Sequence, residues 1–212
     1  MQLRVKDIKD EFKRLKREHM VNEAGLLEIL GASFIADEES IFGTVNYDYI
    51  SKEIAWYKSK SLNVYDMENP PTIWKQIAST QGEINSNYGW CIYSKDNHNQ
   101  YYKVLQCLLK NPNSRQATMI YTRPTMHEDA IKDDMYDFMC TNAVTYSLRN
   151  GKLHCTVQMR SNDAVYGYKN DYAWQRFVLG ELAKDLRVEV GDIYWQVASL
   201  HIYPRHFKLI ED

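Results

Sequence analysis

Cys140 is the residue of this chain with the clearest capacity for covalent chemistry. A cysteine attacks electrophiles as its thiolate, and a free thiol with a pKa of about 8.5 needs a nearby cation to supply that form at neutral pH. Arg160 is a candidate for this cation, because Cys140 begins one predicted strand and Arg160 follows the strand paired with it. The two residues predict a cysteine nucleophile, with a buried structural cysteine as the alternative.

Two side chains outside this region are further candidates. Glu53 lies among apolar neighbours in a predicted helix, where burial would raise the pKa of its carboxyl into the range of a proton shuttle. A solvated carboxylate on a helix surface is the alternative. Arg115 precedes a predicted strand and could bind a phosphate, although a surface arginine fits the same pattern.

Five more polar residues follow the second strand or lie near the end of the chain. Ser161 and Asp163 come directly after that strand, and Asp171 begins a predicted helix, where its simplest role is a cap or a partner of the helix dipole. His201 and Tyr203 are two residues apart in a predicted strand, so their side chains share one face. For this pair, ligand binding and core packing remain equally compatible with the pattern.

A predicted hairpin positions most of these groups. Residues 143–148 and 153–159 alternate between apolar and polar side chains, and Asn150-Gly151 joins them. This dipeptide favours a type I′ turn, which requires positive φ at both central residues. The hairpin brings the thiol, the guanidinium and the carboxylates to one region, as an active-site floor would require.

The rest of the chain mixes predicted helices and strands. Gly31 within the first strand predicts a bulge or a close backbone approach. We expect helices over 1–19, 47–57, 101–109 and 171–186, a short helix containing Trp74, strands over 26–36, 117–121 and 191–203, a polar loop over 82–89 and an exposed insertion over 123–134. No linker or repeat divides the sequence, which predicts a single α+β domain over residues 1–212.

Composition excludes several classes of protein. The chain has 212 residues, 44% of them hydrophobic, which is enough for a full core. A net charge of -2 argues against direct nucleic-acid binding or a membrane-surface protein. No apolar segment approaches the length of a membrane span, and the charged N-terminus does not resemble a signal peptide. These features predict a cytoplasmic protein.

The four cysteines indicate free thiols and no metal site. None belongs to a Cys-x-x-Cys pair, and none lies near a histidine at metal-ligand spacing. A reducing compartment would keep them unpaired. We expect Cys91, Cys107 and Cys155 to be small buried side chains.

Long motifs from about residue 21 to residue 207 carry a family resemblance. In chain order they are G-A-S-F-I-A-D-E, E-I-A-W-Y-K-S-K-S-L, G-E-I-N-S-N-Y-G-W, N-P-N-S-R-Q, M-I-Y-T-R-P, D-F-M-C-T-N, M-R-S-N-D, N-D-Y-A-W-Q and S-L-H-I-Y-P-R-H-F. In these motifs the chain resembles the thymidylate synthase superfamily and, within it, the phage-type deoxycytidylate hydroxymethylases. The resemblance implies a mixed sheet covered by helices, a sheet-to-sheet homodimer and, for a phage-encoded enzyme, location in the host cytoplasm.

The resemblance also implies catalytic and phosphate-binding roles. Cys140 would add to C6 of a pyrimidine, and Glu53 would manage protons and ordered water. Arg160 and Ser161 would bind the nucleotide phosphate. Arg115 would reach the phosphate bound by the neighbouring subunit.

Pocket residues follow from the same resemblance. His201 and Tyr203 would bind the sugar hydroxyl. Trp74, Tyr88 and Asp163 would lie near the nucleobase and the folate. The implied co-substrate is 5,10-methylenetetrahydrofolate, without a metal.

Asp171 falls where uracil-specific members carry Asn. A carboxyl group accepts from the N4 amine of cytosine and, with a shared proton, also bonds N3, whereas uracil would leave polar groups unpaired at about 1 to 3 kcal/mol each. The resemblance therefore implies transfer of a one-carbon unit to C5 of dCMP, followed by hydration to 5-hydroxymethyl-dCMP, a precursor of modified DNA.

Two alternatives remain at this stage. One is a C5-methylase of thymidylate synthase type, acting on dCMP, CMP or dUMP. The other is a non-catalytic nucleotide-binding relative. The second is motivated by the loop over 22–25 and by Gln116, where the family has basic residues, and by the absence of a family tail after Asp212.

Overall fold

The computed structural model describes residues 2–210 and divides the chain into two compact units. Unit 1 consists of Met1–Val45 and Thr145–Asp212, and unit 2 of Asn46–Val144. The single domain over 1–212 stays a prediction.

A mixed sheet forms the centre of unit 1. Its strands are β1 (Leu27–Ile35), β5 (Glu189–Ile202), β4 (Lys152–Asp163) and the part of β3 (Thr141–Arg149) that lies beyond residue 144, in that order. β1 pairs with β5 antiparallel, and β4 pairs with β5 parallel. The α+β class with a mixed sheet is confirmed.

The turn between β3 and β4 confirms the predicted hairpin. Asn150 and Gly151 have φ of 51° and 75°. Both values are positive, as a type I′ turn requires, and asparagine and glycine are the residues that adopt them at least cost.

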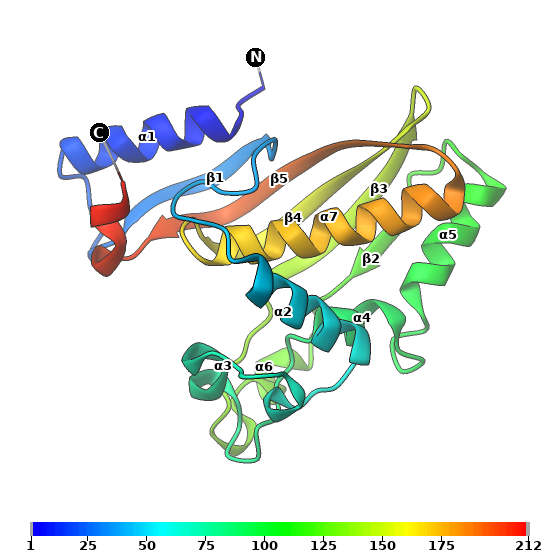
Figure 1. The fold of residues 1–212 in the computed structure, drawn as a ribbon, viewed down its shortest axis with the longest axis horizontal. Coiled ribbons are helices and arrows are strands. Elements are labelled where there is room, and N and C mark those ends of the chain that lie inside the picture. The colour runs from blue at the N-terminus through cyan, green and yellow to red at the C-terminus, as the bar shows by residue number, and fades with distance from the viewer. Residues whose placement is uncertain (1, 211–212) are drawn as a thin grey trace. The chain divides into compact units, whose positions relative to one another are not determined.

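Two helices cover the strands of unit 1. α1 (Val5–Arg17) buries an apolar stripe at helical spacing against β1, made of Val5, Ile8, Phe12 and Leu15. α7 (Gly167–Leu186) lies along β4 and β5, as Figure 1 shows in yellow and orange. The short 3₁₀ helix η3 (Pro204–Leu209) follows β5.

The backbone conformation of Gly31 in β1, rather than a bulge or a close contact, explains why a glycine occupies this position. The pairing with β5 keeps its register on both sides of Gly31, and a Cβ atom built there would meet no atom within 4 Å. The predicted bulge and the predicted close approach are therefore both wrong. The residue has φ of 64°, a left-handed conformation that glycine adopts without strain.

Unit 2 is mostly helical. Its elements are α2 (Tyr47–Ser59), η1 (Val64–Asp66), α3 (Thr72–Ile77), α4 (Tyr88–Tyr93), α5 (Gln100–Lys110), β2 (Thr118–Ile120), α6 (Met126–Asp129) and η2 (Lys132–Asp134), followed by the first residues of β3. The helices predicted over 47–57, around Trp74 and over 101–109 are confirmed, as is the strand over 117–121.

Two predictions for unit 2 are wrong. The segment over 82–89 is not all loop, because Asn87 caps the start of α4, its side chain accepting from the backbone N–H of Trp90 at 2.7 Å. The segment over 123–134 contains α6, and Met126 and Ala130 are buried rather than exposed.

Among the described residues no helix is both long and apolar enough to cross a bilayer. The cytoplasmic location stays a prediction.

Candidate active site

Glu53 lies in the second turn of α2 with only 4% of its surface exposed. Its carboxyl accepts hydrogen bonds from the Tyr49 hydroxyl, one turn earlier, and from the Trp74 indole N–H at 3.3 Å. Burial raises the pKa of Glu53 to about 7, against the opposing effect of these two bonds. Glu53 is thus buried, and a pKa of about 7 is in the range that a proton shuttle requires.

Trp74 connects this carboxyl to an aromatic surface. Its Nε1 lies 3.0 Å from the Tyr49 hydroxyl as well, and its ring packs edge-on against Trp56 at 5.3 Å between centroids. Trp74 is half-buried, so part of its surface is accessible.

Cys140 is half-buried and directly precedes β3, as predicted. Three residues earlier, the Asp137 carboxylate accepts from the backbone N–H groups of Ser86 and of the residue before it, both at 2.7 Å, and from the Ser86 hydroxyl at 2.6 Å. On the other side, Thr141 donates its hydroxyl to the Tyr88 oxygen at 3.0 Å. The thiol is thus held between two buried polar anchors.

Tyr88 begins α4 and is buried between two aromatic rings. It stacks on Tyr57 at 5.2 Å and meets Tyr121 edge-on at 5.3 Å. Arg115 lies apart from these contacts, exposed in the loop between α5 and β2. Its exposure suits a role toward a partner molecule better than a role in the core of unit 2.

In unit 1, Arg160, Ser161 and Asp163 lie inside β4 rather than beyond its end. The prediction ended the strand too early, because the parallel ladder with β5 continues past the hairpin and pairs Asp163 with His201. Strand alternation leaves Arg160 exposed, while Ser161 and Asp163 are half-buried on the opposite face. The register thereby brings two predicted site residues, Asp163 and His201, side by side.

Asp163 also shapes the entry to α7. Its carboxylate accepts from the backbone N–H groups of Val165 at 2.9 Å and Tyr166 at 3.4 Å. A Cβ atom added at Gly167 would lie 3.4 Å from the Asp163 Cβ and 3.8 Å from the Asp171 Oδ2. Both predicted carboxylates therefore flank the first turn of this helix.

Asp171 is not the helix cap that its position in the sequence suggested. α7 begins at Gly167, so Asp171 lies one turn inside it. Its Oδ2 accepts from the Asn162 side-chain amide at 2.8 Å, and the Asn162 oxygen accepts from the Trp195 indole N–H at 3.3 Å. Because an indole N–H can only donate, this contact fixes which way the Asn162 amide faces.

His201 and Tyr203 lie together, as their two-residue spacing predicted, although β5 ends at Ile202, one residue before Tyr203. His201 is buried at the end of β5, whereas Tyr203 is the first residue after it, and their rings meet edge-on at 5.0 Å. The His201 Nδ1 lies 3.4 Å from the Ser199 carbonyl oxygen, and the Ser199 hydroxyl donates to Glu28. This bond, and a second from the Asn22 amide at 2.7 Å, lower the pKa of Glu28.

Three contributors escaped the sequence analysis. Tyr49 lies four residues before Glu53, a helical spacing that could have indicated it. Asn162 stood inside a quoted motif without an assigned role. Lys169 gave no signal: it is 5% exposed, its ammonium donates to the Thr44 carbonyl at 2.8 Å, and burial lowers its pKa against the attraction of Asp163.

Each unit contributes a different chemical capability. Unit 2 holds a thiol, a buried carboxyl that titrates near neutral pH, and aromatic rings for planar groups. Unit 1 holds carboxylates, a buried imidazole and a serine, which suit recognition of a polar ring and its substituents. The described residues include no cluster of three His, Cys, Asp or Glu side chains that could hold a metal ion.

Comparison with known proteins identifies the family to which this chain belongs. The family described as "Thymidylate synthase" matches residues 42–212. The chain belongs to the thymidylate synthase family. It is 52% identical over 206 residues to the deoxycytidylate 5-hydroxymethyltransferases of Enterobacteria phages T4 and T2, a match that covers 92% of this chain and 84% of each of theirs.

Other members of the thymidylate synthase family match less closely. The thymidylate synthase of Francisella tularensis subsp. holarctica is 27% identical over 171 residues, which are 76% of this chain and 62% of that protein. Thermostable thymidylate synthase A from Bacillus subtilis has the same fold, with a TM-score of 0.72 at 20% identity over 96% of this chain and 84% of that one. The predicted family and fold are confirmed, and thymidylate synthase family membership implies use of methylenetetrahydrofolate.

Proposed function

We propose that this protein transfers a one-carbon unit from 5,10-methylenetetrahydrofolate to C5 of dCMP and hydrates the product to 5-hydroxymethyl-dCMP. One observation carries the proposal: 52% identity, across 92% of the chain, to two phage deoxycytidylate 5-hydroxymethyltransferases. At that identity both the fold and the chemistry of a family are commonly retained, and the candidate residues supply each group that the reaction needs.

Asp171 selects the base in this proposal. The amide of Asn162 donates to Oδ2 of Asp171, so that oxygen acts as an unprotonated acceptor. A proton shared with N3 of cytosine therefore belongs on the other carboxyl oxygen, while the N4 amine donates to the carboxylate. Uracil presents a donor at N3 and an acceptor at O4, the reverse pattern, and is disfavoured.

The covalent steps begin at Cys140. Its thiolate adds to C6 of the pyrimidine, and the electron pair moved to C5 attacks the methylene carbon of the folate. Loss of the C5 proton and departure of tetrahydrofolate leave an exocyclic methylene group. Water adds to the carbon of that methylene group. The electron pair of the exocyclic double bond then forms the C5=C6 bond, and the C6–S bond breaks to restore the thiolate.

Glu53 handles the protons of the last step. With a pKa of about 7 its carboxyl is partly ionised at neutral pH, so it can take a proton from the attacking water. The Tyr49 hydroxyl and the Trp74 N–H keep the carboxyl in one orientation. Its burial keeps bulk water from competing with the positioned one.

The remaining candidates bind the two substrates. Arg160 and Ser161 hold the phosphate of dCMP, and His201 with Tyr203 holds the sugar hydroxyl. Arg115, exposed in its loop, reaches the phosphate in the partner subunit of a homodimer.

Folate binding falls to three residues. The half-exposed ring of Trp74 stacks on the folate, while Tyr88 and Asp163 line the space between nucleobase and folate. In the same proposal the protein acts in the cytoplasm, that of the host if it is phage-encoded, with no membrane partner and no direct nucleic-acid binding.

Product analysis tests the reaction. The protein is incubated with methylenetetrahydrofolate and with dCMP, dUMP or CMP, and products are identified by mass. We expect 5-hydroxymethyl-dCMP from dCMP. A methylated product with dihydrofolate absorbance would instead indicate the methylase, and no product with any nucleotide would indicate a non-catalytic relative.

Cys140→Ala tests the nucleophile. The variant should release no tritium from C5 of dCMP, because exchange at C5 requires the adduct at C6. Undiminished release, with dCMP still bound, would remove Cys140 from the mechanism.

Asp171→Asn tests base selection. The amide offers a donor and an acceptor in the pattern that uracil requires, so preference should move from dCMP toward dUMP. The ratio of kcat/KM values for the two nucleotides measures this, and an unchanged ratio contradicts the assignment.

A further inference from the structure

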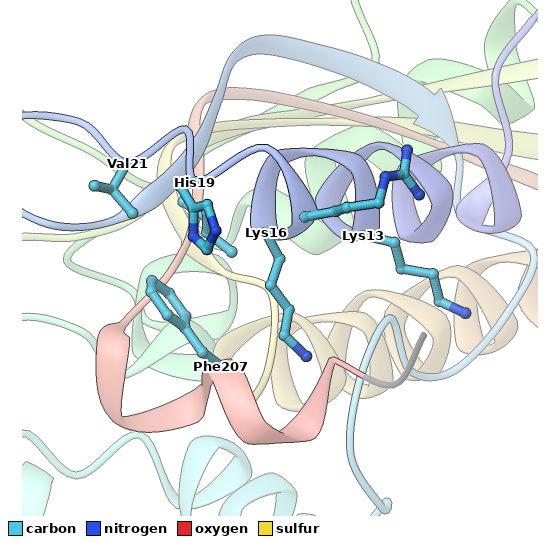
Figure 2. A pocket seen from close by; sticks show the side chains of 7 residues that line it. Lys13, Lys16, His19, Val21 and Phe207 are labelled. Carbon is cyan, nitrogen blue, oxygen red and sulfur yellow. The ribbon is translucent and has the colours of Figure 1, made fainter.

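A basic pocket lies in unit 1, away from the residues assigned above. It is about 620 Å³ in volume and is formed by the second half of α1, the turn after it, the start of β1 and η3 (Figure 2). Its described lining includes none of the candidate active-site residues and consists of Lys13, Lys16, Arg17, His19, Val21, Leu27 and Phe207.

Three cations and a histidine line this pocket, and its described lining contains no carboxylate. Lys13, Arg17 and His19 form no ion pair with any described residue, and the Lys16 ammonium donates to the Ile210 carbonyl at 2.5 Å. Basic residues in the last turn of a helix favour its dipole, which explains some of this charge but not its concentration around a hollow.

Three described acidic residues near the pocket, on α1, at its C-cap and on β1, are paired with other side chains. Glu11 and Glu18 both pair with Arg14, and Glu28 accepts from Asn22 and Ser199. The neighbouring hollow on α1 contains Asp7, Asp10 and Glu11 and shares Lys13 and Arg17 with the basic pocket. Among the described residues, the charged side chains that line the basic pocket are therefore all basic, in a chain whose net charge is -2.

The rest of the lining is apolar. Leu27 is buried at the start of β1, Val21 is 49% exposed, and the half-buried Phe207 ring contributes from η3. Cationic side chains beside an aromatic ring suit a ligand with both a polyanionic and a planar part. The volume is in the range of small-molecule sites, about 300 to 1,000 Å³, and is too small for a folded partner.

We propose that the basic pocket binds a nucleoside triphosphate as an effector, separately from the dCMP site. The triphosphate lies among Lys13, Lys16 and Arg17, and the base packs against Phe207. Occupancy would hold two segments that adjoin the proposed substrate ligands: η3, which follows Tyr203, and the loop over 22–25, whose Asn22 connects through Glu28 and Ser199 to His201.

Calorimetric titration of the full chain with dCTP, and separately with inorganic tripolyphosphate, tests the proposal. The double variant Lys13→Ala/Arg17→Ala should bind both probes at least about tenfold more weakly. Phe207→Ala should weaken dCTP binding and leave tripolyphosphate binding unchanged. Lys9→Ala is the matched control, because Lys9 is on the same helix but pairs with Glu38, and it should bind both probes as the unmodified protein does.

Several results would overturn the proposal. One is equal dCTP affinity in the double variant and the unmodified protein. Another is complete displacement of dCTP by excess dCMP, which would place it in the substrate site. Binding of an acidic peptide in place of dCTP would assign the pocket to a protein partner. Arg17→Ala alone, at an exposed position, repeats the test if the double variant does not fold.

Discussion

Replacing Glu53 with glutamine should change how stability depends on pH. The pKa of the Glu53 carboxyl is about 7 in the folded protein, against an ordinary value of 4.5. Between these two values the folded protein holds a proton that the unfolded chain has released, so the free energy of unfolding falls as pH rises. Each pKa unit corresponds to about 1.4 kcal/mol, which makes the full loss about 3 kcal/mol above pH 7.

Glu53→Gln removes this loss, because the amide cannot ionise and its oxygen still accepts from Tyr49 and Trp74. Urea unfolding at about pH 5 and about pH 8 measures the effect. The variant should be more stable than the unmodified protein at the higher pH, by up to about 3 kcal/mol, and similar at the lower. Its turnover should fall about 100-fold or more, since the proton acceptor is gone.

The matched control is Glu68→Gln, which alters an exposed carboxylate paired with Lys52. Its stability should stay within about 0.5 kcal/mol at both pH values. If Glu53→Gln keeps the pH dependence of the unmodified protein, the Glu53 carboxyl ionises normally and the burial argument is wrong.

Two further changes test packing and orientation. Gly89→Ala should lower the free energy of unfolding by about 3 kcal/mol or more, because the new Cβ would stand 1.8 Å from the Tyr57 carbonyl oxygen. Denaturant unfolding measures this loss. A variant as stable as the unmodified protein would refute the close approach. Asn162→Leu should lower the free energy of unfolding by about 1 to 3 kcal/mol, since it leaves the buried Trp195 N–H unpaired. It should also reduce the preference for dCMP over dUMP, because the Asp171 carboxyl loses the amide that orients it. An unchanged ratio of kcat/KM values for the two nucleotides would show that the amide does not position the carboxyl.

Local patterns predicted the secondary structure well where a physical signal was strong. The Asn150-Gly151 turn, the apolar stripe of α1 and the alternation of β4 each follow from short-range rules. The start of α7 was not predicted by these rules. Tyr166, directly before the helix, offers no capping side chain, and Asp163, which accepts from the turn that leads into it, lies three residues earlier. Asp171 was consequently placed at a helix end rather than inside the helix.

The candidate site could also be predicted from the sequence only in part. Residue type and a burial argument made Glu53 and Cys140 candidates; the burial of Glu53 agrees with the structure, and the catalytic roles of both stay predictions. Contacts between distant segments were not predictable, since nothing in the sequence states that Trp195 lies beside Asn162 or that Trp74 reaches Glu53. The Arg115 role, the homodimer and the joint action of the site residues stay predictions.

Under the proposed function, the bond from Trp195 to Asn162 gives the apolar core a part in choosing the nucleotide. Trp195 is fully buried, and its indole N–H determines which end of the Asn162 amide faces Asp171. An exchange to phenylalanine would let the amide turn over and present oxygen to oxygen, which favours a protonated Asp171. If Asp171 selects the base as proposed, a mutation of this buried tryptophan would change the pyrimidine preference without altering any residue that contacts the nucleotide in the proposal.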